Sequence, residues 1–285
     1  MKHHWLYLFR RITIRCRKIL FSKKNSKPYL SGDFFSSLAD FRVNDLTDLS
    51  YLLSFKGNLE VIFCKSELVP ELHRRIPSQF QGKILIAGNS DVEFVEIKDL
   101  PLFAFERFFL QNSMISENTR VFTLPIGIEN LSLGQNGLPW LMRSNRAWDS
   151  RKNKILVGPF SPTHEERDEL MQLDAELPFI SKIPFNVTPR QLHRLQTQFK
   201  YVACPRGNGI DTHRFWEVLY RGAVPVIKKS NWSSSLKILN LPMLEVDSWS
   251  GEDLQNAMQN STISNFNPKD LSSLWAEHWK ALFQR

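Results

Sequence analysis

Cysteine is scarce in this chain of 285 residues, which contains only Cys16, Cys64 and Cys204. The three thiols show no C-x-x-C spacing and no even pairing. The sequence therefore excludes a scaffold held together by disulfides and a zinc site built from cysteines. This cysteine usage favours a cytoplasmic protein, and we expect that compartment.

Metal-binding motifs are missing as well. The seven histidines are scattered without an H-E-x-x-H pattern, and no D-x-D triplet is present to hold a metal ion on a diphosphate. Asp91 and Glu93 form one D-x-E pair, which is a weak signal by itself. We therefore predict no metal site and no bound cofactor.

Long hydrophobic runs and early acidic residues are also absent. No apolar run approaches the roughly 18 residues that a membrane-spanning helix needs.

The first 32 residues hold nine basic side chains and no acidic one, whereas residues 33–285 hold 28 basic and 29 acidic side chains. A nucleic-acid-binding protein would carry positive charge on its folded domain, so the neutral body disfavours nucleic acid as a partner.

The basic N-terminal segment, residues 1–32, has the pattern of an amphipathic helix. Arg10 and Arg17 lie opposite an apolar arc of about 120° on a helical wheel, formed by Trp5, Leu8, Phe9, Ile12, Cys16, Ile19 and Leu20. Residues 1–27 would anchor the protein on an anionic membrane or pack their stripe on the domain, and the sequence favours neither. Arg10 and Arg11 interrupt the apolar region that a secretory signal requires.

Short apolar segments alternate with helical patterns along the rest of the chain. Strands are expected at residues 59–64, 83–88, 120–128, 154–162, 201–205, 223–227 and 243–246, and helices at residues 100–112, 163–174 and 212–220. This order predicts parallel sheets with crossover helices. We therefore expect an α/β protein of two Rossmann-like domains, residues 33–150 and 151–285, with a cleft between them.

Residues 204–227, CPRGNGIDTHRFWEVLYRGAVPVI, read as strand, glycine-rich turn, helix and strand. Ligands of open α/β sheets bind at the carboxyl ends of strands, beside helix N-termini. Gly207 and Gly209 would let the backbone approach an anion, and Asp211 or Thr212 would cap the helix. The unpaired amides of its first turn would then face a phosphate.

The predicted helix has an apolar and a polar face. The apolar face, toward the core, comprises Phe215, Val218 and Leu219. The polar face, toward the cleft, comprises His213, Arg214, Glu217, Tyr220 and Arg221. Glu217 would accept hydrogen bonds from ribose hydroxyls, and Arg206 and Arg214 would bind phosphate oxygens. The pattern thus indicates a nucleoside diphosphate site. In the purely structural alternative, Glu217 forms an ion pair with Arg214 or Arg221, and His213 caps the helix or packs against neighbouring side chains. Gly222 is suited to ending the helix.

The same stretch closely resembles the signature of the exostosin-like glycosyltransferases and their bacterial relatives, in the subgroup related to the dystroglycan xylosyltransferase. Three elements of the first half resemble that subgroup in the same order: IAGNSD (86–91), RFFLQN (107–112) and LPIGIEN (124–130). The resemblance covers residues 60–250. It implies a GT-B architecture, a nucleotide-sugar donor held mainly by the second domain, and transfer without a metal ion.

Together, the pattern and the resemblance lead us to expect specific residues on the two sides of the cleft. The donor side comprises Arg206, Gly207, Asn208, Gly209, Asp211, His213, Arg214 and Glu217, and the acceptor side comprises Asn89, Ser90, Asn112, Glu129 and Asn130. The chain departs from its relatives at Gly88, where we expect histidine, and at Thr212, where cysteine is common. Asp91 is then the best candidate for the general base, with Glu93 and Glu129 as alternates. On pattern alone, Asp91 would be a turn-capping residue after a strand.

The expected activity is transfer of a sugar from a nucleoside diphosphate to a hydroxyl of a glycan or lipid-linked oligosaccharide, in surface polysaccharide synthesis. A non-catalytic protein that binds carbohydrate or nucleotide-sugar stays open because of Gly88. A sugar-nucleotide hydrolase or epimerase would bind the same donor. Residues 271–285 predict an amphipathic terminal helix, which in GT-B proteins often packs back on the first domain.

Overall fold

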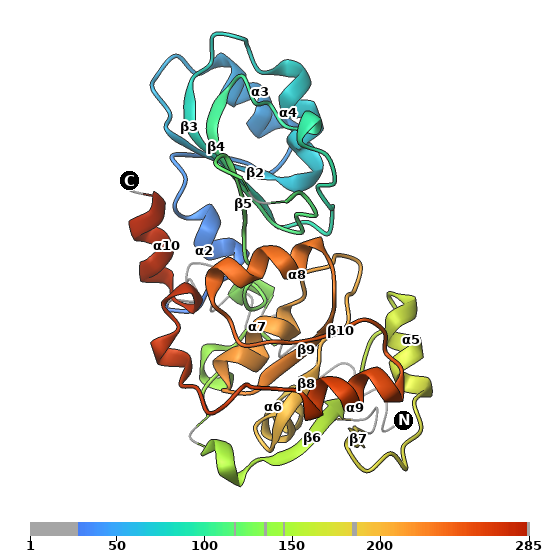
Figure 1. The fold of residues 1–285 in the computed structure, drawn as a ribbon. Coiled ribbons are helices and arrows are strands. Elements are labelled where there is room, and N and C mark those ends of the chain that lie inside the picture. The colour runs from blue at the N-terminus through green and yellow to red at the C-terminus, as the bar shows by residue number, and fades with distance from the viewer. Residues whose placement is uncertain (1–27, 117, 134–135, 145, 184–186, 284–285) are drawn as a thin grey trace, which may run out of the picture.

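The computed structural model describes residues 28–116, 118–133, 136–144, 146–183 and 187–283. It contains two separate five-stranded sheets, in which all neighbouring strands run parallel (Figure 1). The prediction of an α/β fold with two Rossmann-like units, as in GT-B proteins, is confirmed. The expected helix of residues 1–27 lies outside the described residues. Within the described part, no helix is both long and apolar enough to cross a bilayer.

The first sheet has the strand order β1-β2-β3-β4-β5 and forms the upper lobe of Figure 1. Its elements are β1 (Phe41–Val43), α3 (Leu46–Ser54), β2 (Val61–Lys65), α4 (Val69–Arg75), β3 (Gly82–Gly88), β4 (Phe105–Leu110) and β5 (Val121–Thr123). Alternate strand residues enter two different cores. Leu85 and Ala87 pack in the cluster that includes α3 and α4, whereas Ile84 and Ile86 pack on the opposite face. Both faces are therefore buried, as is typical of parallel sheets.

The second face of this sheet is covered by α2 (Gly32–Ser36) and by α10 (Ala276–Phe283), from the two ends of the described chain. The Trp279 ring lies 5.4 Å from that of Phe35, and the Phe283 ring lies 4.5 Å from that of Phe109. In Figure 1, α10 runs beside both lobes. The terminal helix thus returns from the second unit to pack on the first sheet.

The second sheet has the order β10-β9-β8-β6-β7. Its elements are β6 (Lys152–Val157), α5 (Glu165–Gln172), β7 (Ile180–Lys182), α6 (Pro189–Gln196), β8 (Phe199–Ala203), α7 (His213–Tyr220), β9 (Val224–Lys228), α8 (Asn231–Leu236), β10 (Leu244–Val246) and α9 (Gly251–Gln259). The chain adds β7 on one side of β6 and β8 on the other side. The strand order therefore reverses between β6 and β8, where open α/β sheets leave a crevice for a ligand.

The predicted helix at residues 100–112 is wrong, because this segment contains β4. Phe105, Phe108 and Phe109 are buried between the two helical layers, and β4 pairs with β3 and β5. An apolar run buried on both faces has no alternation, so periodicity alone did not separate it from a helix. The predicted strand at 120–128 is also shorter than expected, since only Val121–Thr123 is extended, and β1 and β7 were not predicted.

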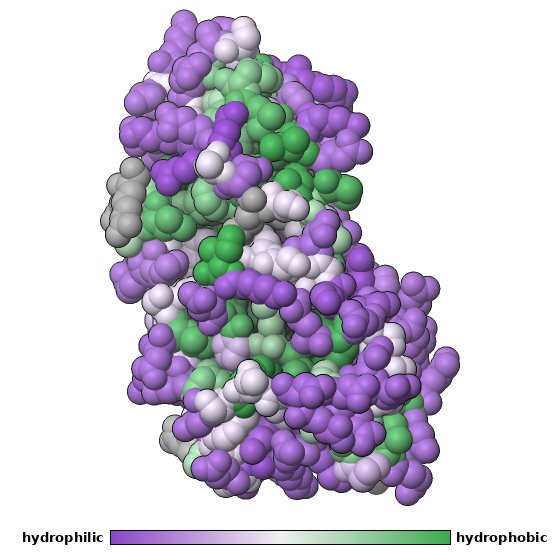
Figure 2. Space-filling view, in the orientation of Figure 1, coloured by the Kyte–Doolittle hydropathy of each residue, from purple (hydrophilic) through white to green (hydrophobic). Residues whose placement is uncertain are grey.

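Hydrophilic side chains cover most of the face in Figure 2, and hydrophobic ones gather over the upper lobe and between the lobes. Most of the large hydrophobic side chains that stay exposed belong to the first unit: Leu46, Tyr51, Phe55, Val92, Val95, Ile97 and Phe103. None of these residues lines the cavity described next.

Candidate functional site

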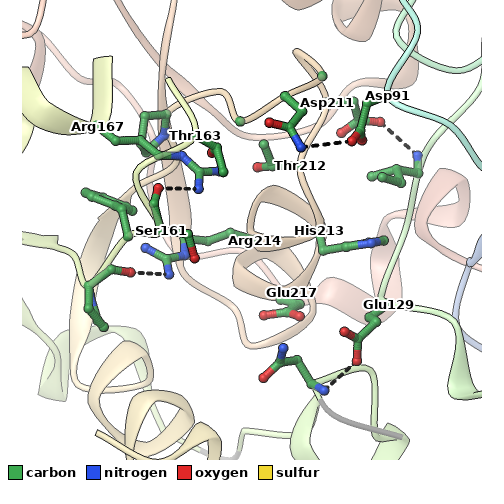
Figure 3. Close-up of a pocket in the computed structure, with 18 of the residues that line it drawn as sticks. Asp91, Glu129, Ser161, Thr163, Arg167, Asp211, Thr212, His213, Arg214 and Glu217 are labelled. Atoms are coloured by element: carbon green, nitrogen blue, oxygen red, sulfur yellow. Dashed lines mark hydrogen bonds between the residues drawn. The ribbon is translucent and has the colours of Figure 1, made fainter. Parts of the chain in front are cut away.

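A cavity of about 400 Å³ lies between the two units (Figure 3). The second unit supplies the loop after β6, the loop after β8 and the first turns of α7, and the first unit supplies the loops after β3 and β5. The lining residues of the second unit include Pro159, Phe160, Ser161, Thr163, Arg167, Gly207, Asn208, Gly209, Asp211, Thr212, His213, Arg214 and Glu217, and those of the first include Asp91, Ile126 and Glu129. The cavity therefore opens where the second sheet reverses its strand order.

The N-terminus of α7 forms part of the cavity wall. Thr212 is the N-cap residue, but its side chain accepts no hydrogen bond from the first turn, which differs from the predicted capping role. The first-turn amides consequently lie at the cavity without a side-chain cap. At the other end, Gly222 has a φ of +69° and ends the helix as predicted.

Two arginines from different helices line the same side of the cavity (Figure 3). The Nη2 atom of Arg214 donates to the Pro159 carbonyl at 2.7 Å, and its guanidinium lies 4.7 Å from the centre of the Phe160 ring. Arg167 donates from Nε to the Arg206 carbonyl at 2.8 Å and from Nη1 to the Ser161 carbonyl at 3.1 Å. These bonds hold both side chains in place without neutralising their charge.

The electrostatics of the arginine pair favour an anion. Burial lowers the pKa of both guanidinium groups, and the charge of Arg214 lowers the pKa of Arg167 further. In the described ranges, no carboxylate oxygen lies within 4.0 Å of either guanidinium group. Glu166 acts on Arg167 and Glu217 on Arg214 only from beyond ion-pair distance. Two half-buried positive charges of this kind are stabilised when an anion enters the cavity.

The two glycines of the turn after β8 are required by close packing. A Cβ atom on Gly207 would lie 2.6 Å from Nη2 of Arg167, and one on Gly209 would lie 2.7 Å from the amide of Asn112. Glycine therefore lets the turn approach a cavity arginine on one side and the first unit on the other. Gly207, Asn208 and Gly209 line the cavity, as predicted for the donor side.

Asp211 joins the turn to both units. Its carboxylate accepts hydrogen bonds from the Ile126 amide at 2.8 Å and from Trp216 Nε1 at 2.8 Å, while its own amide donates to Asn112 Oδ1 at 2.9 Å. Burial raises the pKa of Asp211 to about 7, although the N–H donors oppose the shift. This residue lines the cavity, and its hydrogen bonds position the turn.

His213 is held in one orientation beside the first unit. Its Nδ1 atom lies 2.9 Å from the Gly127 carbonyl, which can only accept a hydrogen bond, so Nδ1 carries the proton. In the neutral ring, Nε2 is then an acceptor. Figure 3 shows His213 on the opposite side of α7 from Arg214. The ring thus offers a proton acceptor on the side of the cavity away from the arginine pair.

Glu217 lines the cavity one turn further along α7. Its Oε2 atom lies 3.5 Å from both terminal nitrogens of Arg221, so the ion pair considered as a structural alternative is present. Burial lowers the pKa of Arg221 to about 10. Glu217 therefore combines a buried ion pair with a position on the cavity wall.

Asp91, predicted as the general base, and Glu129, predicted on the acceptor side, both line the cavity. Asp91 Oδ2 accepts from Asn208 Nδ2 at 3.1 Å, across the two units. Glu129 Oε2 accepts from the amides of Asn136 and Gly137 at 2.6 Å and 3.2 Å. Both carboxylates are thus fixed by donors at the edge of the cavity.

The other predicted acceptor residues do not line the cavity. Asn130 donates to Asn89 Oδ1 at 3.1 Å, and Asn112 donates to the Ser90 carbonyl at 3.1 Å. Asn89 and Asn112 have φ values of 56° and 55°, a left-handed conformation that asparagine tolerates better than most residues. These four residues hold the loops that carry Asp91 and Glu129.

Arg206 is the donor-side residue that the structure places away from the cavity wall. Its guanidinium forms an ion pair with Glu93 of the first unit. Gly88, where we expected histidine, ends β3 beside Gln111, whose Oε1 would lie 3.2 Å from an added Cβ atom. A side chain at position 88 would therefore require Gln111 to move.

Arg167 is the cavity residue that sequence reasoning missed. It lies in the first turn of α5, where the helix dipole disfavours a cation, and it follows Glu165 and Glu166. A lone arginine at the start of an acidic helix was the available signal. The sequence analysis gave residues 163–174 only as a helix, because the partners of Arg167 lie in loops on either side of other elements.

Within the described ranges, no three His, Cys, Asp or Glu side chains gather closely enough to hold a metal ion. Comparison with protein-family models and with curated protein sequences found no match to this chain.

Proposed function

We propose that this protein is a glycosyltransferase that moves a sugar from a nucleoside diphosphate to a hydroxyl group. The observation that carries the proposal is the meeting of Arg167, Arg214 and the uncapped N-terminus of α7 at one cavity. Guanidinium groups and helix amides are the groups that bind phosphate oxygens in proteins. The resemblance of residues 204–227 to exostosin-like glycosyltransferases supports the same assignment.

In this proposal, the diphosphate lies against the two arginines and the first turn of α7. Negative charge develops on the leaving diphosphate as the bond to the sugar breaks, and fixed positive groups stabilise that charge. The carbonyl contacts of Pro159 and Ser161 keep the guanidinium groups in position before the donor arrives. The proposed leaving-group stabilisation uses no metal ion. Glu217 would accept hydrogen bonds from the ribose hydroxyls.

The acceptor hydroxyl attacks the anomeric carbon of the sugar, and its proton passes to a base on the far side of the cavity. We assign this role to His213 in preference to Asp91, which the sequence favoured. The Gly127 carbonyl fixes the His213 tautomer so that Nε2 accepts, whereas Asp91 is exposed and bonded to Asn208. Asp91 and Glu129 would then orient the acceptor at the cavity edge.

The acceptor in this proposal is a glycan or lipid-linked oligosaccharide of surface polysaccharide synthesis. The protein would work in the cytoplasm, held at the inner face of the membrane by residues 1–27. The basic composition of that segment supports this location.

A transfer assay tests the proposed function. Purified full-length protein is incubated in EDTA with a panel of nucleotide-sugars, with and without lipid-linked and glycan acceptors, and the released nucleoside diphosphate is measured. Release that depends on the acceptor supports a transferase. Release without any acceptor would indicate a hydrolase, and donor binding without release would indicate a binding protein. Activity that disappears in EDTA and returns with manganese would refute the metal-independent mechanism.

A further inference from the structure

A second cavity, of about 430 Å³, is lined by residues of α6 and of the segment before β6. We call it the arginine cavity, since Arg143, Arg146, Arg190 and Arg194 line it. Arg190 and Arg194 lie four residues apart on α6, so they project from the same face of the helix. Arg143 and Arg146 come from the segment that precedes β6. Four exposed arginines from two separate segments thus line one hollow.

These positive charges have no negative partner in the parts of the chain that the structure describes. No Asp or Glu oxygen lies within 4.0 Å of any of the four guanidinium groups. Like charges four residues apart destabilise a helix. Burial lowers the pKa of the nearby Arg151 to about 10, and the charge of Arg146 adds to this shift. Residues 33–285 carry 28 basic and 29 acidic side chains, so the excess of positive charge around this cavity is local.

The two cavities share one wall residue, His193, which is 6% exposed. Arg221 can only donate, so its contact of 3.1 Å with His193 Nε2 makes that nitrogen an acceptor. Burial lowers the pKa of His193 to about 3, so the ring stays neutral. The residue common to the two cavities is therefore uncharged, and it does not neutralise the four arginines.

We propose that the arginine cavity is a second anion site, which binds a phosphate or diphosphate group. Guanidinium groups match the geometry of phosphate oxygens. Four positive charges also favour a diphosphate over a ligand that carries a single carboxylate. The volume fits a small charged group. If the proposed transferase function also holds, the ligand is the phosphate-bearing end of the acceptor, because the two cavities share His193 as a lining residue.

Calorimetric titration of the full-length protein with inorganic pyrophosphate tests this site. The double variant Arg190→Gln with Arg194→Gln, called the α6 variant below, should weaken pyrophosphate binding at one class of sites at least tenfold. Its matched control is Arg74→Gln with Arg75→Gln, which removes two exposed charges from α4 and should leave binding unchanged. Both pairs lie on helix surfaces, and circular dichroism checks that each variant folds.

The Arg167→Gln variant separates this proposal from the proposed donor site. Loss of one class of sites in the α6 variant and of another in Arg167→Gln supports both assignments. Loss in the α6 variant alone supports the arginine cavity and contradicts the donor site. Pyrophosphate binding that the α6 variant leaves unchanged overturns the second site, whatever Arg167→Gln does.

Further titrations distinguish the source of the phosphate. Farnesyl diphosphate that binds more tightly than pyrophosphate, with the same sensitivity to the α6 variant, indicates a lipid-linked ligand. Equal binding of pyrophosphate and a sugar phosphate indicates a soluble one. Binding of a carboxylated polysaccharide but of none of the phosphate compounds would contradict the proposal.

Discussion

At the scale of single residues, the proposed donor side of the cavity contains a pair of like charges. Arg167 and Arg214 come from α5 and α7, and backbone carbonyls hold both without a carboxylate partner among the described residues. Repulsion between them is relieved when an anion binds, so the pair favours a ligand of two negative charges over a neutral sugar. Each guanidinium group should therefore contribute strongly to donor affinity.

Arg167→Gln should weaken nucleotide-sugar binding at least tenfold, because a hydrogen bond to a charged group contributes about 1.5–3 kcal/mol. Arg206→Gln should have a much smaller effect, since Arg206 pairs with Glu93 and does not line the cavity. Calorimetric titration of both variants measures the difference. The opposite order of effects would show that the donor lies along Arg206, as the sequence pattern suggested.

His213→Gln should lower the rate of transfer by about 10² to 10⁴, the usual effect of removing a general base. Donor affinity should stay within about threefold, since the diphosphate is bound by the arginines on the other side of α7. Asp91→Asn is the comparison, with a smaller loss expected. Turnover assays under saturating donor decide between them, and a large loss in Asp91→Asn alone would return the base role to Asp91.

Asp211→Asn should destabilise the fold by about 1–3 kcal/mol, because an amide nitrogen would face N–H donors. In the parent, the pKa of Asp211 is raised from 3.8 to about 7, so this group stabilises the fold fully below about pH 4 and loses that contribution as the pH rises to about 7. The stability deficit of the variant should therefore be largest near pH 4 and smaller near pH 7. Urea unfolding at both pH values measures it, with the exposed Asp247→Asn as control. A deficit that grows with pH would contradict the raised pKa.

The sequence was informative about residues that share one element and uninformative about residues that meet in space. His213, Arg214 and Glu217 were predicted toward the cleft and line the cavity, although His213 and Arg214 lie on opposite sides of α7. Tyr220 and Arg221, predicted on the same face, are buried instead. Arg206 belonged to the same short motif, yet its side chain turns to Glu93, which is 113 residues away in sequence. Arg167 was missed for the converse reason, because its contacts lie in loops before α5 and after β8.

At the scale of elements, burial explains both the correct predictions and the errors. The turn and helix at 204–220 were predictable, since glycines and an amphipathic pattern mark them. The strand β4 was predicted as a helix because its phenylalanines are buried on both faces of the sheet. The edge strands β1 and β7 have three residues each, too few to show an alternation of apolar and polar side chains, and were missed. The edge strand β10 is equally short but was predicted, because its segment is apolar and follows a turn.

Trp279→Ala in α10 should lower the free energy of unfolding by about 3–5 kcal/mol, as expected for removal of a large buried ring. Trp279 is 1% exposed, contacts Phe35 and donates from Nε1 to the Ser273 carbonyl at 2.9 Å. Tyr51→Ala, at a tyrosine that is 65% exposed, is the control and should change stability by less than about 0.5 kcal/mol. Chemical unfolding gives both values. Equal stability of the two variants would mean that α10 adds little to the fold.

At the scale of the whole molecule, hydrogen bonds between the two units surround the cavity. Asp91 contacts Asn208, Asn112 contacts Asp211, and Gly127 contacts His213. The alternation of strands and helices predicted two parallel units and a cleft. It did not predict the strand order, which depends on pairing between β6 and β8 and which places the cavity at the reversal.

The basic leader carries a separate prediction at this scale. Deleting residues 1–27 should release the protein from phosphatidylglycerol vesicles, because the remaining chain is nearly neutral. Vesicle co-sedimentation measures binding, and circular dichroism with thermal unfolding checks the fold. A truncated protein that is unfolded or insoluble would show instead that this segment packs on the domain.

The central claim is that the cavity between the units binds a nucleoside diphosphate sugar through Arg167, Arg214 and the first turn of α7. Calorimetric titration of full-length protein with a panel of nucleotide-sugars, repeated on Arg167→Gln and on the surface control Arg74→Gln, tests it most directly. The account predicts that at least one member binds, that Arg167→Gln weakens this binding at least tenfold, and that Arg74→Gln does not change it. If no nucleotide-sugar binds, or if Arg167→Gln binds as tightly as the parent, the claim is contradicted.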